Sequence, residues 1–178
     1  MKLEDLVKPT LPFLDQGVAQ VAIIVEDLDA AVEAYWKLFG IGPWDIYTYE
    51  KPLVKTMTYH GRAADYRMKL ALSYLGETRI ELIEPLEGDT VYADFVEEHG
   101  YGVHHFGVLV EEMDEALSLA EDAGIEMIMD GAGFGLDGDG HYAYLDTEDL
   151  IGVTIELIER PEGRVLPERV YPAEREDA

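Results

Sequence analysis

The pentapeptide IELIE occurs twice in the chain, at residues 80–84 and 155–159. The stretches around it match as well: "QVAIIVEDLDAA" aligns with "HFGVLVEEMDEA", and "TRIELIEPLEG" aligns with "VTIELIERPEG". A repeat of this kind indicates duplicated supersecondary units, each of which needs the other to complete its core. The 178 residues are enough for one well-packed domain built from two such units.

The first half of the chain has the pattern of a strand, a helix and three more strands. Branched apolar residues predict a buried strand at about 18–26, and helical spacing predicts a helix over 27–40. Either Asp27 or Asp29 can cap the start of this helix, and Gly40 can end it. The other expected features are a short strand within 41–49, a loop-like stretch at 50–65, and a hairpin of 65–76 and 78–85 that turns near Gly76 and Glu77.

The second half repeats the plan. Its elements are a strand at 102–112, a helix at 112–124, a strand at 125–131, a glycine-rich loop at 131–140, and a hairpin of 141–147 and 152–160. The sequence thus predicts an α+β fold, in which two tandem βαβββ modules (17–98 and 99–160) form one domain with a curved sheet around a shared cup. The polar tail, residues 161–178, is expected to wrap the surface or to be partly disordered.

Strand alternation separates the side chains that face the helices from those that face the cup. The apolar positions of four strands mark the helix face, and the alternate positions place Gln20, Glu81, His105 and Glu156 at equivalent depths on the cup face. A carboxylate between Ile and Leu is costly to bury unless it is paired or bound to a metal. The four residues therefore predict a metal site, and an O/N donor set without sulfur suits Zn²⁺, Ni²⁺, Co²⁺, Mn²⁺ or Fe²⁺.

The remaining histidines and repeat glutamates are assigned other roles. Alternation places His104 on the helix side as a structural residue, and Glu84 and Glu159 at strand ends as solvated rim residues. Three histidines in or near loops are expected at the surface: His60, His99 and His141. Of these, His141 borders the glycine-rich loop and is placed to reach a substrate. That loop either closes over the cup or is only a mobile connection.

The formal charge of −25 argues against nucleic-acid binding, which requires clustered Lys and Arg. The acidic surface either keeps the protein soluble or is an adaptation to salt. One short stretch is basic and contains Lys51, Lys55, Arg62, Arg67 and Lys69. Two roles are expected for it: either it binds an anionic ligand, or its charges protect an exposed strand edge. No apolar run approaches the ~20 residues of a membrane span, and no signal peptide is recognised, so we expect a cytoplasmic protein without membrane contacts.

These residues and motifs resemble the vicinal oxygen chelate superfamily, which includes glyoxalases, methylmalonyl-CoA epimerases, extradiol dioxygenases and bleomycin-resistance proteins. The resemblance covers about 17–160 and rests on stretches such as "QVAIIVEDLDAAVEAYWKLFGIGPW" and "AYLDTEDLIGVTIELIERP". It implies one glyoxalase-like domain with the metal ligands Gln20, Glu81, His105 and Glu156. The Gln/Glu/His/Glu set is similar to that of zinc-using glyoxalase I, which favours Zn²⁺, whereas residues 80–110 resemble an epimerase.

The resemblance implies a metal-dependent isomerase or epimerase that moves a proton next to a carbonyl through a metal-stabilised enediolate. Glu156 is expected to move the proton, with Glu81 serving the reverse step. Lys69 is the ionisable residue nearest to the second carboxylate base of epimerases, which this chain lacks. The alternatives are a lactoylglutathione lyase of the glyoxalase I type and a drug- or toxin-binding protein. The expected partners are a carbonyl substrate, either an acyl-CoA or a thiol adduct, and a second copy of the chain in a homodimer.

Overall fold

The computed structural model describes residues 10–173, which form one curved mixed sheet with a few helices. The strands are β1 (Gln20–Ile24), β2 (Trp44–Tyr49), β3 (Thr56–Tyr59), β4 (Arg62–Ala63), β5 (Arg67–Leu75), β6 (Thr78–Glu87), β7 (Gly102–Leu109), β8 (Met127–Ala132), β9 (His141–Leu145), β10 (Thr154–Glu159) and β11 (Arg169–Tyr171). The helices are η2 (Pro12–Leu14), α1 (Leu28–Phe39), α2 (Val91–His99), α3 (Met113–Asp122) and α4 (Glu148–Ile151).

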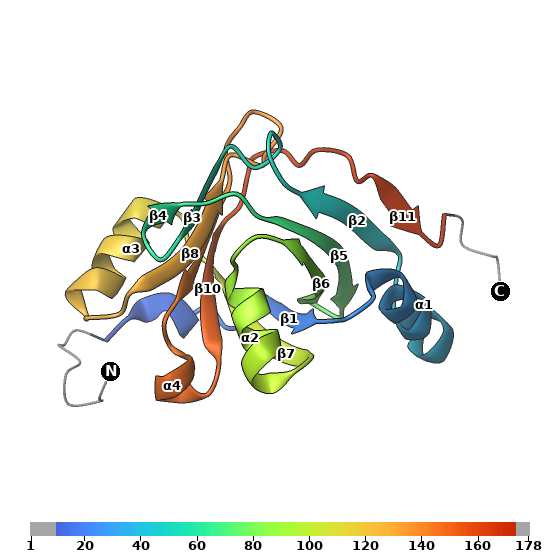
Figure 1. Ribbon diagram of the computed structural model, residues 1–178, viewed down its shortest axis with the longest axis horizontal. Helices are drawn as coiled ribbons and strands as arrows, with labels where there is room; N and C mark the ends of the chain where they lie inside the picture. Colours follow the sequence, from blue (N-terminus) through green and yellow to red (C-terminus); the bar gives the residue numbers. More distant parts are fainter. Residues whose placement is uncertain (1–9, 174–178) are drawn as a thin grey trace.

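The strands lie in the order β11-β2-β5-β6-β1-β7-β10-β9-β8-β3-β4. At the centre, β1 and β7 run antiparallel, and each has a parallel neighbour, β6 beside β1 and β10 beside β7. The sheet bends into an open cup, with α1 and α3 outside its two ends and α2 against its inner side (Figure 1). The four central strands are the ones on which the sequence places the four candidate ligands.

The outer faces of the two halves pack under their helices in the same way. Ile80 and Leu82 of β6 join Leu28 of α1 in one apolar cluster, and Ile155 and Leu157 of β10 join α3 in another. The inner face carries a third cluster, rich in tyrosine, to which α2 also contributes. This arrangement confirms the predicted α+β class and the predicted division of strand residues between helix face and cup face.

The predicted ends of the first helix and the first hairpin are confirmed. The side chain of Asp27 accepts a hydrogen bond of 2.9 Å from the Ala30 N–H, and Gly40 ends α1 in the left-handed conformation. In the hairpin, Leu75 pairs with Thr78, so Gly76 and Glu77 form the turn between β5 and β6. Asp27 therefore caps the helix, rather than Asp29.

The loop-like interpretation of residues 50–65 is wrong. This stretch contains β3 and β4, and β3 pairs antiparallel with β8 of the second half, with Met57 opposite Gly131. Both strands are short and largely polar, so no local periodicity marks them, and β3 is held by a partner far away in the sequence, whereas β4 pairs only with β3. Since β3 joins the sheet of the second half, the module boundaries 17–98 and 99–160 stay a prediction.

The described part of the polar tail wraps the surface. Residues 169–171 form β11, which pairs antiparallel with β2, and Arg164 forms a backbone bridge with Gly135 of the glycine-rich loop. The last five residues, 174–178, and the N-terminal arm, 1–9, lie outside the described residues. The tail thereby brings the Arg164 side chain back towards the cup.

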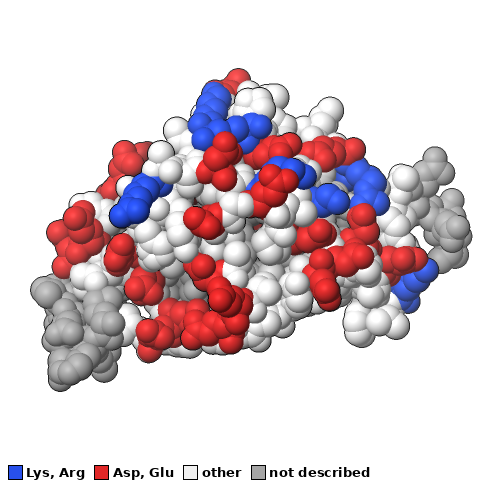
Figure 2. Space-filling view, in the orientation of Figure 1, with Lys and Arg blue, Asp and Glu red and all other residues white. Residues whose placement is uncertain are grey.

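Acidic side chains cover much of the visible face of the molecule, and Lys and Arg gather mainly towards its upper side (Figure 2). The basic residues of the stretch from Lys51 to Lys69 differ in their surroundings. Arg62 lies on the terminal strand β4, as a charged edge residue would, whereas Arg67 forms ion pairs with Glu50 and Glu87. None of the helices within residues 10–173 is both long and apolar enough to cross a membrane.

Candidate metal centre

The four predicted ligand residues come together on the cup face of the central strands. Gln20, Glu81, His105 and Glu156 are all buried, with 1%, 7%, 0% and 4% of their surface exposed. The Nε2 atom of His105 lies 3.2 Å from Glu156 Oε2 and 3.5 Å from Glu81 Oε2. Duplicated strand pairs thus place two carboxylates symmetrically around one imidazole.

Three of these residues fit a divalent cation. The ligand atoms of Glu81, His105 and Glu156 all lie within 4.8 Å of one another. Two ligands at about 2.0 Å from a tetrahedral ion are about 3.3 Å apart, which matches the separations between the imidazole and the carboxylates. A cavity of about 30 Å³ is lined by both glutamates and by Gln20, and a volume of this size holds a single ion or water.

Gln20 points its amide nitrogen, and not its oxygen, at the two carboxylates, and an NH₂ group does not bind a metal ion. Its Nε2 group donates to Glu81 Oε2 at 2.8 Å and to Glu156 Oε2 at 2.9 Å, while its Oε1 accepts from Arg79 Nε at 2.6 Å. Rotating the amide by half a turn points its oxygen at the carboxylates and its NH₂ group at the Arg79 donor. Arg79 therefore holds Gln20 as a donor to both carboxylates, and the role of Gln20 as a fourth ligand stays a prediction.

Gly107 leaves room for this cluster. A Cβ atom at this position would lie 2.7 Å from Ile158 Cδ1, 2.8 Å from Gln20 Cβ and 3.0 Å from Glu156 Oε2. Separations of this size are shorter than van der Waals contact. The absence of a side chain at position 107 therefore lets strands β1, β7 and β10 bring their polar side chains together.

The electrostatics of the cluster follow from its burial. Burial lowers the pKa of His105, but the carboxylates of Glu156 and Glu81 outweigh it and raise this pKa to about 9. Tyr144 donates from its hydroxyl to Glu156 Oε1 at 3.0 Å, and its own oxygen lies 2.6 Å from the Tyr92 hydroxyl. Burial raises the pKa of Tyr144 well above its ordinary value, so this hydroxyl keeps its proton and remains a donor.

The expected position of His104 is wrong, although its structural role is supported. In the pairing of β7 with β1, Ala22 lies opposite His105 and Ile23 lies opposite Val103, so His104 is an extra residue in a bulge. The bulge turns the His104 ring to the cup side, where it packs against Phe95 of α2. Its Nδ1 lies 2.9 Å from Nδ1 of His105, and burial lowers its pKa to about 2.

The last glutamates of the two repeats are not solvated rim residues. Glu84 Oε2 accepts from the Leu28 N–H at 2.9 Å, and Glu159 Oε2 accepts from the Met113 N–H at 2.6 Å. Both carboxylates thus lie at helix N-termini, α1 and α3 respectively, where unpaired N–H groups and the helix dipole favour negative charge. The interpretation failed because alternation gives the face of a strand residue but not the helix end that lies over it.

The other candidate groups do not enter the cup. Lys69 lies opposite Glu84 in β6, on the outer face that carries α1, so it is not placed to act as a second base. His141 pairs with Asp130 at 2.7 Å, and His99 pairs with Glu148 at 2.7 Å. His60 is exposed, as expected. The structure therefore supports surface or structural roles for these histidines and gives His141 no contact with the cluster.

Sequence reasoning missed three residues around the cluster, Tyr144, Arg79 and Arg164. Arg79 precedes Glu81 by two positions and pairs in register with Gln20, so alternation alone would have placed it on the cup face. Tyr144 lies opposite Glu156 in the second hairpin. Arg164 lies in the tail, and no local pattern connects it to the site. The glycine-rich loop adds Phe134, which is buried and lines the small cavity.

Among solved structures, the chain resembles methylmalonyl-CoA epimerase from Mycobacterium tuberculosis, with 21% identity, a TM-score of 0.59, and coverage of 87% of this chain and 93% of that one. It also resembles a hypothetical protein from Bacillus halodurans C-125, with 22% identity, a TM-score of 0.55, and coverage of 83% and 96%. Identities this low show a common fold. A curated relative, the uncharacterized protein YqjC of Bacillus subtilis (strain 168), is 29% identical over 115 residues, which are 65% of this chain and 81% of the relative.

The family comparison identifies the chain at the level of its superfamily. Residues 19–144 match the profile described as the glyoxalase/bleomycin resistance protein/dioxygenase superfamily. The match covers more than half of the chain and includes Gln20, Glu81 and His105. The curved sheet and its central cluster agree with this match. The chain therefore belongs to the glyoxalase/bleomycin resistance protein/dioxygenase superfamily.

Proposed function

We propose that this protein is a metal-dependent isomerase or epimerase that moves a proton on the carbon next to a carbonyl group. The observation that carries the proposal is the convergence of two buried carboxylates, Glu81 and Glu156, on Nε2 of His105. Two carboxylates this close and this buried repel each other and are poorly solvated, so they need positive charge beside them, which without a metal comes from His105. A divalent ion bound between the two carboxylates would supply this positive charge, which accounts for buried carboxylates on the central strands.

The side chains around the cluster suggest how the proton moves. A divalent metal held by Glu81, His105 and Glu156 would polarise the substrate carbonyl and stabilise the negative charge that forms beside it. Tyr144 holds one oxygen of Glu156, while the other faces the centre of the cluster. We expect Glu156 to take a proton from a substrate carbon, and Glu81, on the other strand pair, to return one to the other face.

Two alternatives share the same site. A lyase of the glyoxalase I type is favoured by the donor set itself, since Gln20 stands beside two glutamates and one histidine. A small-molecule binding protein of the same superfamily would use the cup without turnover. The relatives named as methylmalonyl-CoA epimerases support the first proposal, and the structure of one of them holds 2-nitronate-propionyl-CoA. An acyl-CoA is therefore the first substrate class to test.

The proposal is tested by solvent deuterium exchange. Protein purified without chelator is incubated in D₂O with methylmalonyl-CoA or with the hemithioacetal of methylglyoxal and glutathione, and label at the reacting carbon is measured by mass spectrometry. We expect exchange with one of these substrates, and its loss in Glu156→Gln with metal still bound. Glu77→Gln, at the exposed hairpin turn, is the matched control. Exchange that persists in Glu156→Gln places the base elsewhere, and metal-free protein that binds both compounds without exchange favours the binding protein.

A further inference from the structure

Arg79 is a buried cation whose Nε donates a hydrogen bond to a neutral amide. Only 6% of its surface is exposed, and within residues 10–173 no carboxylate forms an ion pair with its guanidinium group. Its Nε donates to the neutral Gln20 amide. With no ion pair of its own, this buried charge depends on negative groups nearby, which without a metal are Glu81 and Glu156.

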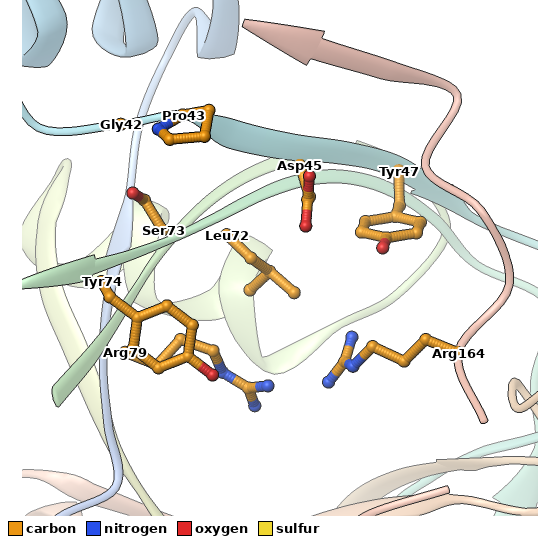
Figure 3. A pocket seen from close by; sticks show the side chains of 9 residues that line it. All are labelled: Gly42, Pro43, Asp45, Tyr47, Leu72, Ser73, Tyr74, Arg79 and Arg164. Carbon is orange, nitrogen blue, oxygen red and sulfur yellow. The ribbon is translucent and has the colours of Figure 1, made fainter. Parts of the chain in front are cut away.

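Arg164 points at the same space from another part of the chain. The two guanidinium groups face each other across a pocket of about 300 Å³, and Asp45 and Tyr47 of β2 line its other side (Figure 3). Arg164 is carried by the tail that bridges to Gly135, so the wrapped tail completes the pocket. Two arginines that face each other repel, and an anion between them removes the repulsion.

The pocket adjoins the candidate metal centre and shares lining residues with it. Arg79 and Arg164 also line the cavity of about 30 Å³ that contains Glu81 and Glu156. Without a metal, the two glutamates offset the charge of the two arginines. A dication at the centre would neutralise the glutamates, and the arginine pair would then face only Asp45. One negative charge on a ligand in the pocket restores the balance.

We propose that Arg79 and Arg164 form a subsite for a carboxylate of the substrate. The proposal rests on the proposed function, because it places the substrate in the same cup. An arginine fork matches a carboxylate through two parallel N–H···O bonds, and two forks approaching from opposite sides fix the carboxylate in one orientation. The substrate class is thereby narrowed to carbonyl compounds that carry a carboxylate in addition to the oxygens at the metal.

Isothermal titration with succinate tests the subsite without turnover. The proteins compared are the natural chain, Arg164→Gln, Arg79→Gln and the control Arg62→Gln, which makes the same charge change at an exposed residue of the terminal strand β4. We expect Arg164→Gln and Arg79→Gln to weaken succinate binding roughly tenfold or more, and Arg62→Gln to leave it unchanged. Arg164 is exposed, so its variant is expected to fold even if the buried Arg79 variant does not.

Metal content is measured in every variant, so that weaker binding caused by metal loss is recognised. Equal succinate affinity in the natural chain and in Arg164→Gln overturns the proposal. Inorganic phosphate that binds more tightly than succinate, and depends on Arg164, overturns the choice of a carboxylate. If Arg164→Gln loses succinate binding but the natural chain shows no deuterium exchange, the subsite is supported and the proposed reaction is contradicted. Failure of the subsite and failure of the proposed function are thus distinguishable.

Discussion

The closest packing at the candidate metal centre lies at Gly107, where any side chain would meet Gln20 and Glu156. Strand alternation decides which side chains lie on the cup face, so the face of single residues was predictable here. Gln20, Glu81 and Glu156 follow the period of two and were placed correctly from the sequence. His104 was not, because the bulge in β7 interrupts the period, and Arg79 shares the period but was overlooked.

Gly107→Ala is expected to destabilise the protein by roughly 1–3 kcal/mol, because the added methyl group overpacks the cluster. Urea unfolding followed by circular dichroism measures the difference. Gly102→Ala is the control, since it lies on the same strand and a Cβ there meets no atom within 4 Å. Equal stability of the two variants would contradict the packing described for the centre.

Gln20→Ala tests whether the amide supports the metal or binds it. Because Gln20 directs its Nε2 group at the carboxylates, its removal is expected to weaken metal affinity by no more than about 100-fold, as for other groups that only support ligands. His105→Ala, which removes a ligand, is the comparison and is expected to abolish stoichiometric binding. If Gln20→Ala loses its metal as completely as His105→Ala, the Gln20 amide must rotate by half a turn in the natural chain so that its oxygen binds the ion.

At the scale of elements, each long helix is tied to its own half of the sheet by a repeat glutamate. Glu84 accepts from the first turn of α1 and Glu159 from the first turn of α3. The sequence predicted both helices, since their apolar spacing is regular over ten or more residues. It did not predict α2, β3, β4 or β11, which are short or depend on partners distant in the sequence.

Glu159→Gln is expected to lower stability by about 1 kcal/mol, because α3 has no side-chain cap of its own and loses a carboxylate at its N-terminus. Glu84→Gln is expected to cost less, since Asp27 also caps α1. Chemical denaturation of both variants, and of the control Glu77→Gln at the exposed turn, measures which variant loses more stability. A larger loss of stability in Glu84→Gln than in Glu159→Gln would contradict these roles of the two glutamates.

In the molecule as a whole, the two halves enclose one cup (Figure 1), and the chain carries a net charge of −25. The class of fold was predictable because the repeated sequence segments correspond to repeated structural units. The pocket beside the candidate metal centre was not predictable, because Arg164 reaches it through the tail and its bridge to Gly135. The homodimer and the cytoplasmic location stay predictions, and sedimentation velocity is the measurement for the first.

Salt is expected to stabilise the molecule, because like charges at this density repel and screening shortens their range. Between 0.05 and 1 M NaCl we expect Tm to rise by roughly 3 °C or more, which corresponds to about 1 kcal/mol. Sucrose at matched osmolality separates screening from general solvent exclusion. A Tm that is flat or falls in NaCl would mean that the acidic side chains are spaced widely enough not to repel.

The central claim is that Glu81, His105 and Glu156 hold a divalent metal. Elemental analysis of protein purified without chelator, and again after incubation with Zn²⁺, Ni²⁺ or Co²⁺ and dialysis, measures this most directly. We expect about one equivalent of one such metal per chain, and its loss in His105→Ala. Less than a tenth of an equivalent in both preparations of the natural chain would contradict it.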